Sequence, residues 1–427
     1  MINIFIKKEQ IYSNPIKYIF SVLAKNISSP ISIVDDKSQA QVIVDHTDSN
    51  SIKVNLEFYG KLINKQLYNP QNYFVDKPFI KFQDGSIDNL STAFYLINSL
   101  QEHREIEPSD DNYDKFGRFK YNKSIQNKFN CIEDNVVQKC FDQFCSENPV
   151  IMPFVKNANP SRVFLTHDID KIYGSFTEDG LWAFKRGRID VILKLILNEI
   201  LLRPDWKNID KLAKIESEHD LKSCFFWLAT KKVGANKVIN ADYNIKKEQR
   251  LTTIAGINGL HKSCYSYSLN EELEKLPFQT SYNRYHYLKI DLPNTWNEIE
   301  SSKIQLDTSL GFAERYGFRN SYGLPFRPYD LKHQQSHNFL EVPLNVMDTT
   351  FMIYMKIPSG KTSYSIIDFI EKNKTNCVLS ILWHNNYFTN YKFGGYLNEY
   401  KKILLYLIEA NIKSITPEGI IKEYYND

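Results

Sequence analysis

Two carboxylates directly follow a short apolar run, a position at which they could hold a metal ion and move a proton. Val163–Leu165 is typical of a strand that is buried on both faces, and Asp168 and Asp170 follow it. Because side chains alternate along an extended strand, both carboxylates point to one side and His167 points to the other. Neighbouring carboxylates repel, which raises the pKa of at least one unless a cation is present. The pair therefore indicates either a metal site with an adjacent base or a solvated loop.

Three histidines occupy comparable positions near the ends of other short segments, namely His261, His286 and His384. A single histidine in such a position is more often structural. In α/β folds, however, the carboxyl ends of parallel strands converge on one site. Together with the aspartate pair, the histidines therefore predict one shared pocket.

Hydrophobic periodicity predicts the elements that must carry these residues. We expect strands over residues 2–6, 31–34, 40–44, 52–58, 163–170, 221–228, 340–344 and 378–384. We expect helices over residues 15–25, 92–100, 133–144, 189–202, 210–219, 397–409 and 417–424. Alternating strands and helices are typical of an α/β fold. The pattern predicts a small α/β N-terminal domain of unknown role over 1–125, a helical linker over 126–159 and a second α/β domain over 160–427.

The predicted helix over residues 189–202 is apolar except for a narrow stripe of Lys194, Asn198 and Glu199. Such a helix is typically mostly buried. Docking on a membrane surface is the alternative, although the helix lacks a strong basic face.

The amino-acid composition argues against several classes of protein. The 427 residues include 53 basic and 50 acidic side chains, and this small excess argues against a dedicated nucleic-acid binder. The six cysteines form no CxxC motif and suit a reducing compartment. No apolar stretch reaches the roughly 18 residues of a transmembrane helix, and the first residues do not resemble a signal peptide. We therefore expect a cytoplasmic protein without a transmembrane segment.

Four short motifs carry a resemblance to a known family: Thr166-His167-Asp168-Ile169-Asp170, Gly259-Leu260-His261-Lys262-Ser263, Arg284-Tyr285-His286-Tyr287 and Leu382-Trp383-His384. They resemble the polysaccharide deacetylase (NodB-homology) family of carbohydrate esterases, in the branch whose first motif is Thr-His-Asp-x-Asp. The resemblance covers about residues 160–425. It implies an irregular (β/α) barrel, here preceded by the small α/β domain. It also implies metal-dependent removal of N- or O-acetyl groups from a sugar or polysaccharide precursor in cell-envelope polysaccharide assembly.

The resemblance implies a role for each motif. Asp168 would be the general base, Asp170 and His261 metal ligands, and His384 the general acid. We expect Arg284 to orient Asp168. The family normally supplies a second histidine four residues after the first, but Tyr265 stands there.

Our hypothesis for the third ligand is His286, with His167 as the alternative. One aspartate and two histidines form a three-ligand site that leaves positions open for water. We expect one divalent ion, zinc in the first place, with cobalt, nickel or manganese as alternatives.

The predicted substrate-binding residues are Tyr265, Arg319 and Trp383. Arg319 is included because a buried arginine needs a carboxylate partner or an anionic ligand. Two other functions remain open at this stage. One is a catalytically inactive glycan-binding or scaffold protein, which the missing second histidine favours. The other is a metal-dependent hydrolase of a non-sugar amide.

Overall fold

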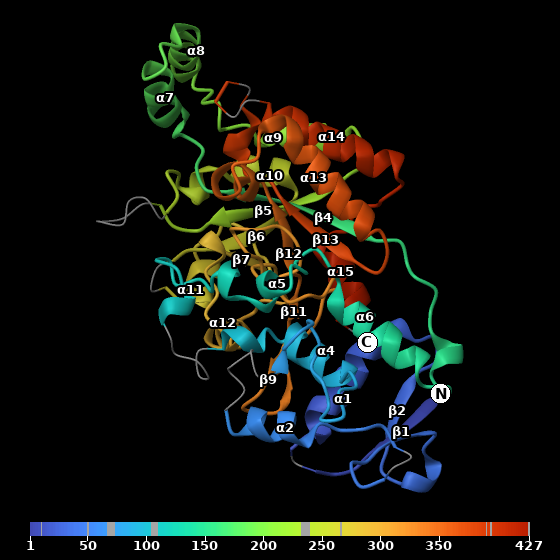
Figure 1. The fold of residues 1–427 in the computed structure, drawn as a ribbon. Coiled ribbons are helices and arrows are strands. Elements are labelled where there is room, and N and C mark those ends of the chain that lie inside the picture. The colour runs from blue at the N-terminus through green and yellow to red at the C-terminus, as the bar shows by residue number, and fades with distance from the viewer. Residues whose placement is uncertain are drawn as a thin grey trace.

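The computed structural model describes residues 1–9, 11–48, 51–65, 73–103, 110–231, 240–264, 267–389, 391–392 and 395–425. A small parallel sheet forms the N-terminal part (Figure 1). Its strands are β1 (Ile2–Ile6), β2 (Ile31–Val34) and β3 (Val42–Val44), in the order β2-β1-β3. Inward-facing residues of β1 are buried and alternate with half-buried ones, as expected for one covered face.

Before the second sheet begins, the chain also forms five helices in the described residues: α1 (Ser13–Leu23), α2 (Leu56–Ile63), α4 (Asn89–Ile97), α5 (Ile125–Lys128) and α6 (Val136–Ser146). The predicted strand over 52–58 is wrong in its second half. The side chain of Asn55 accepts a hydrogen bond from the amide of Phe58, and this cap starts α2. Ile52 alone continues the sheet, through an isolated bridge to Val44.

The larger sheet contains eight strands, and all of its strand pairs are parallel. In spatial order the strands are β11 (Leu340–Glu341), β8 (Leu306–Asp307), β7 (Tyr282–Tyr285), β6 (Ile257–Lys262), β5 (Ser223–Leu228), β4 (Arg162–Ile169), β13 (Val378–Leu382) and β12 (Leu344–Met347).

The two edge strands of this sheet, β11 and β12, are separated by only residues 342 and 343. The amide of Val342 donates to the carbonyl of Asp307 at 2.8 Å, and that of Leu344 donates to the carbonyl of Leu310 at 3.0 Å. One extended segment therefore joins both edges, and the sheet curls into an irregular (β/α) barrel. The fold class is the one expected from the sequence.

Around the barrel lie α9 (Ile209–Ser217), α10 (Gln249–Ala255), α11 (Leu269–Leu273), α12 (Asn294–Glu300), α13 (Ser359–Lys372), α14 (Tyr396–Glu409) and α15 (Pro417–Tyr424). A two-stranded hairpin, β9 (Tyr329–Asp330) and β10 (Gln335–Ser336), packs against α1. The helices α7 (Gly180–Phe184) and α8 (Ile189–Ile200) stand away from the barrel (Figure 1).

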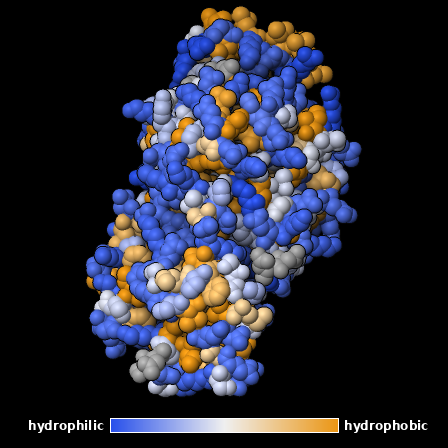
Figure 2. All heavy atoms as spheres, turned by 90° about the vertical axis from the view of Figure 1, so that its right-hand side faces the viewer, coloured by the Kyte–Doolittle hydropathy of each residue, from blue (hydrophilic) through white to orange (hydrophobic). Residues whose placement is uncertain are grey.

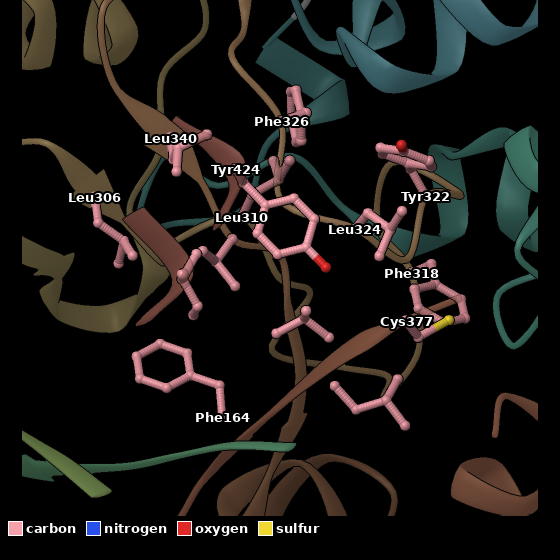
Figure 3. Packing of buried hydrophobic residues seen from close by; sticks show 14 of the residues in the cluster. Phe164, Leu306, Leu310, Phe318, Tyr322, Leu324, Phe326, Leu340, Cys377 and Tyr424 are labelled. Atoms are coloured by element: carbon pink, nitrogen blue, oxygen red, sulfur yellow. The ribbon is translucent and has the colours of Figure 1, made fainter. Parts of the chain in front are cut away.

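Apolar side chains fill the barrel at the amino-terminal ends of its strands. Figure 3 shows Leu306, Leu340 and Phe164, from three strands, in one buried cluster with Tyr424 of α15. Leu306 and Leu340 are the first residues of their strands, and Phe164 is near the start of β4. With the amino-terminal end filled by side chains, a pocket has room at the carboxyl end.

One buried apolar cluster continues from the N-terminal part through α6 into the barrel. An ion pair reinforces this contact, because Arg319 donates from Nε to Oε1 of Glu102 at 3.0 Å and both side chains are buried. The domain ranges 1–125, 126–159 and 160–427 stay predictions.

The expectation that the helix over 189–202 is mostly buried is wrong. Only Val191 and Leu195 of α8 are buried, because the helix packs on α7 and not on the barrel. Among the described residues, we find no helix with both the length and the apolar character that a membrane crossing requires.

Candidate metal centre and active site

Strand β4 contains Asp168 and is followed directly by Asp170. It lies in the middle of the sheet between β5 and β13, and its residues from Val163 onward are buried. Asp168 and Asp170 face one side, whereas His167 faces the other. There Nδ1 of His167 lies 2.7 Å from the carbonyl oxygen of Trp383, and Nε2 lies 2.8 Å from Oε1 of Glu216. The pleat of the strand thus places His167 away from the pair, and His167 is not among the residues gathered around Asp170.

Asp170, His261 and His286 form a group whose ligand atoms all lie within 4.8 Å of one another. Oδ1 of Asp170 is 3.3 Å from Nε2 of His261 and 3.5 Å from Nε2 of His286. Within the described part of the chain this buried oxygen accepts no hydrogen bond. A buried carboxylate oxygen without a donor, facing two imidazole nitrogens, fits a divalent cation.

The surroundings of Asp170 favour its charged form. Burial alone would raise its pKa, but His286 and His261 outweigh burial and lower the pKa well below the usual range. The carboxyl group is therefore a carboxylate, the form that binds metals.

His261 is held in one orientation. Its Nδ1 lies 2.9 Å from the backbone carbonyl of Arg284. Because a carbonyl only accepts, Nδ1 carries a proton, and Nε2 is the nitrogen that faces the carboxylates and would bind a metal ion. A metal-binding histidine is commonly oriented through a hydrogen bond from its other nitrogen in this way.

Arg284 holds Asp168 beside the group. Its Nη1 donates to Oδ1 of Asp168 at 2.8 Å and to Oγ1 of Thr166 at 2.9 Å. Its Nε donates to the carbonyl of Thr308 at 2.9 Å, and the guanidinium stacks over the ring of Phe226. Burial would raise the pKa of Asp168, but the charges of Arg284, His261 and His384 together outweigh burial and lower it. Asp168 is thus an ionised carboxylate with Oδ2 turned toward His261, 3.5 Å from Nε2.

His384 lies on the other side of Asp170, with its Nε2 3.9 Å from Oδ2 of that residue. Its Nδ1 is 2.7 Å from Oδ1 of Asp348, and its backbone amide donates to Oδ2 of Asp348 at 2.6 Å. Burial would lower the pKa of His384, but the carboxylates of Asp348, Asp170 and Asp168 together outweigh burial and raise it to about 9. Near neutral pH this imidazole carries a proton.

Sequence analysis missed Asp348. A usable signal was present, because Asp348 directly follows the buried strand β12, just as Asp168 and Asp170 end the run of β4. None of the four motifs that resemble the family contains Asp348.

Residues from the N-terminal part reach the rim of the site. Nη1 of Arg118 donates to the carbonyl of Tyr287 at 3.1 Å, and Nη2 donates to the hydroxyl of Tyr354 at 3.2 Å. The rings of Phe116 and Tyr287 are stacked, and Tyr287 stacks in turn on His286. Hydrophobic periodicity in the sequence cannot predict this contact, because Arg118 and Tyr287 are 169 residues apart in the chain.

Two of the three predicted substrate-binding residues lie elsewhere. Arg319 is buried and paired with Glu102, so its carboxylate partner is part of the fold. Trp383 is buried against Tyr396 and Tyr400, because alternation turns it away from the side that His384 faces. Tyr265 lies outside the described residues.

No protein-family model and no curated protein matches this sequence. In structure the chain is similar to a protein described as a polysaccharide deacetylase from Mycobacterium smegmatis, with a TM-score of 0.39 and 12% identity over 62% of this chain and 90% of that one. It is similar to a peptidoglycan N-acetylglucosamine deacetylase, with a TM-score of 0.30 and 16% identity over 62% and 90% of the two chains.

It is also similar to a mutant CE4-family pseudoenzyme with restored enzymatic activity, with a TM-score of 0.28 and 12% identity over 62% and 69%. The sequence motifs resemble the same class of proteins. At these identities and TM-scores, the conclusion on function rests on the geometry of the site.

Proposed function

We propose that this protein is a metal-dependent deacetylase that removes an N- or O-acetyl group from a sugar or polysaccharide precursor. One observation carries the proposal: a held carboxylate and a charged imidazole both adjoin the group of Asp170, His261 and His286. Oδ2 of Asp168 lies 3.5 Å from Nε2 of His261, and Nε2 of His384 lies 3.9 Å from Oδ2 of Asp170. Hydrolysis of an acetyl group needs a base on one side of the reacting carbon and an acid on the other.

Asp170, His261 and His286 would hold the cation. The set of one carboxylate and two imidazoles suits zinc, and cobalt, nickel or manganese could bind the same set. When bound, the metal would supply Lewis acidity to the acetyl carbonyl and lower the pKa of water in the site.

The protein's own groups would move the protons. Oδ1 of Asp168 is occupied by Arg284, so Oδ2 is the oxygen that would accept a proton from the attacking water. His384 enters the reaction protonated and would donate from Nε2 to the departing nitrogen or oxygen of the sugar, while Asp348 holds its Nδ1. Arg284 touches no reacting atom in this scheme and is a positioning residue.

A catalytically inactive glycan-binding or scaffold protein is the second candidate. Tyr265 in place of a histidine favours it. A hydrolase of a non-sugar amide is the third, since a fold does not determine the substrate. The cytoplasmic location and a role in cell-envelope polysaccharide assembly stay predictions.

Acetate release from N-acetylated chitooligosaccharides tests the proposal, with metal content measured on the same preparation by mass spectrometry. We expect bound metal, acetate release, loss of activity in a chelator and recovery on addition of zinc. Asp168→Asn should keep the metal and lose the activity. A metal-loaded protein that releases acetate only from small acetamides would favour the third candidate. A protein that binds the oligosaccharide but is inert after metal addition would favour the second.

A further inference from the structure

The chain between β4 and α9 leaves the barrel as a helical hairpin, residues 175–203, which we call the projecting hairpin. It contains α7 and α8, and Figure 1 shows both helices standing out from the barrel. Ala183, Val191 and Leu195 form a small core between them, with Tyr391 packed against it.

Large apolar side chains cover the outside of this hairpin. Leu193 and Ile200 of α8 expose 61% and 72% of their surface, and Phe184 of α7 exposes 75%. Figure 2 shows the apolar side chains gathered at this end of the molecule. On α8 the exposed apolar positions follow helical spacing along one face: Ile189, Leu193, Ile196, Leu197 and Ile200. Exposed patches of this kind mark sites of interaction.

Positive charge borders the apolar face. The projecting hairpin contains five basic and four acidic side chains. Two of the acidic ones, Glu178 and Asp179, are paired with lysines outside the hairpin, Lys171 and Lys392. Within the described residues, Lys185, Arg186 and Arg203 form no ion pair, and Arg186 lies over the ring of Trp182. The surface therefore combines apolar, aromatic and basic side chains, which is typical of helices that lie at a membrane interface.

A basic groove begins where the hairpin ends. It has a volume of about 900 Å³, and the exposed Leu201 and Leu202 form part of its wall. Six basic side chains line it against three acidic ones, namely Lys194, Arg203, Lys207, Lys211, Lys247 and Arg250 against Asp205, Asp210 and Glu248. Burial and the charges of Lys401 and Lys194 lower the pKa of Lys211, as expected where positive charge accumulates. Such a groove suits phosphate groups.

We propose that the projecting hairpin docks on the surface of an anionic lipid bilayer, with its apolar face in the interface and the basic groove against lipid phosphates. The 12 residues of α8 span about 18 Å, well short of a hydrocarbon core of about 30 Å. The helix therefore lies along the surface and does not cross the bilayer. A second copy of the chain is a poorer occupant, since it would bring the same excess of positive charge.

The hairpin is joined to the candidate active site. Asn385, next to His384, donates from Nδ2 to the carbonyl of Lys171 at 2.8 Å and to that of Trp206 at 2.7 Å. These two residues flank the hairpin, and Lys171 directly follows Asp170. Docking would hold the active site beside the bilayer. This docking inference rests on the proposed function and names the class of its substrate, an acetylated glycan carried on a lipid anchor.

Sedimentation with vesicles tests the docking without reference to activity. We expect the full-length protein to bind vesicles of phosphatidylcholine with phosphatidylglycerol, and to bind pure phosphatidylcholine vesicles at least about tenfold more weakly. Leu193→Ser with Leu197→Ser should weaken binding by at least about tenfold, because these side chains enter the interface. Arg203→Glu with Arg250→Glu should remove the preference for the anionic lipid.

The matched control is Leu405→Ser with Ile408→Ser, two exposed apolar residues of α14 on the barrel. It should bind vesicles as the unchanged protein does. The docking proposal fails if the unchanged protein ignores both vesicles, or if the hairpin variant binds as well as the control. The docking proposal also fails if sedimentation equilibrium shows that the unchanged protein and the control are dimers and the hairpin variant is a monomer. In that case a second copy of the chain covers the apolar face of the hairpin.

Activity separates this proposal from the proposed function. With soluble chitooligosaccharide the hairpin variant should release acetate at the normal rate. With N-acetylglucosamine carried on a diacylglycerol in anionic vesicles it should be at least about tenfold slower than the control. Equal rates on the vesicle substrate would refute the assigned substrate class. An unchanged protein that binds vesicles but hydrolyses neither substrate would refute only the deacetylase function.

Discussion

Nη1 of Arg284 lies 2.8 Å from Oδ1 of Asp168, and the backbone carbonyl of the same arginine holds Nδ1 of His261 at 2.9 Å. One residue of β7 thus orients both the proposed base and a proposed metal ligand. It can do so because β7 is paired with β6, where Arg284 stands opposite His261.

The first prediction concerns this pairing. Arg284→Lys keeps the charge but loses the forked donor that contacts Asp168, Thr166 and Thr308 together. We expect kcat to fall by roughly 10- to 100-fold, because a small displacement of a catalytic group is costly, while KM changes little. Steady-state kinetics checks this, and metal content serves as the control. A loss confined to KM would mean that Arg284 binds substrate directly.

The second prediction concerns the third ligand. His286→Ala should lower metal affinity by more than about 100-fold, because even outer partners of a metal site contribute roughly 10- to 100-fold. Titration with a competing chelator measures the affinity. The control is His333→Ala, an exposed histidine that contacts Asp330 in the turn between β9 and β10. If His286→Ala retains the full metal stoichiometry and affinity, the ligand set proposed here is wrong.

The third prediction assigns Arg319 to stability. Arg319→Met leaves the buried carboxylate of Glu102 without its partner, which should lower the free energy of unfolding by about 3–5 kcal/mol. Glu102→Gln should be destabilising as well, and the double variant Arg319→Met, Glu102→Met should recover part of the loss. Urea unfolding measures all three. A stable Arg319→Met protein with a raised KM would instead restore the predicted role in substrate binding.

The fourth prediction concerns pH. Asp88 begins α4, where its side chain accepts a hydrogen bond from the amide of Ser91. Burial raises its pKa from 3.8 to about 6. Between these values the folded protein binds more protons than the unfolded chain, so the free energy of unfolding falls as pH rises from about 4 to 6. The two pKa units correspond to roughly 3 kcal/mol.

Asp88→Asn keeps the cap and removes the titration. We expect the stability of the variant, relative to the unchanged protein, to increase by roughly 3 kcal/mol between pH 4 and pH 7. Urea unfolding at several pH values measures it. Asp36→Asn is the matched control: Asp36 also caps a helical turn, but it is exposed and hydrogen bonds to Ser38 lower its pKa. If both variants respond alike across this range, burial of Asp88 is not the cause.

Local patterns predicted much of the fold. The apolar runs that became β4, β5 and β13 could be recognised because a strand buried on both faces needs consecutive apolar residues. The short strand β8 could not be predicted in this way, because two residues are too few to show a periodicity. The expected strand over 52–58 failed at Asn55, where a capping side chain outweighed β propensity.

For the candidate site, the sequence by itself determined which side chains of a single strand point to the same side. Asp168 and Asp170 share a side, and His167 faces away from them, because side chains on a strand repeat every two residues. Only the tertiary structure decided which strand ends meet. The approach of Asp348 to His384, of Arg118 to Tyr287 and of Glu102 to Arg319 depends on strand order and on the packing of the N-terminal part against the barrel. Those contacts join residues far apart in the chain, and no local spacing encodes them.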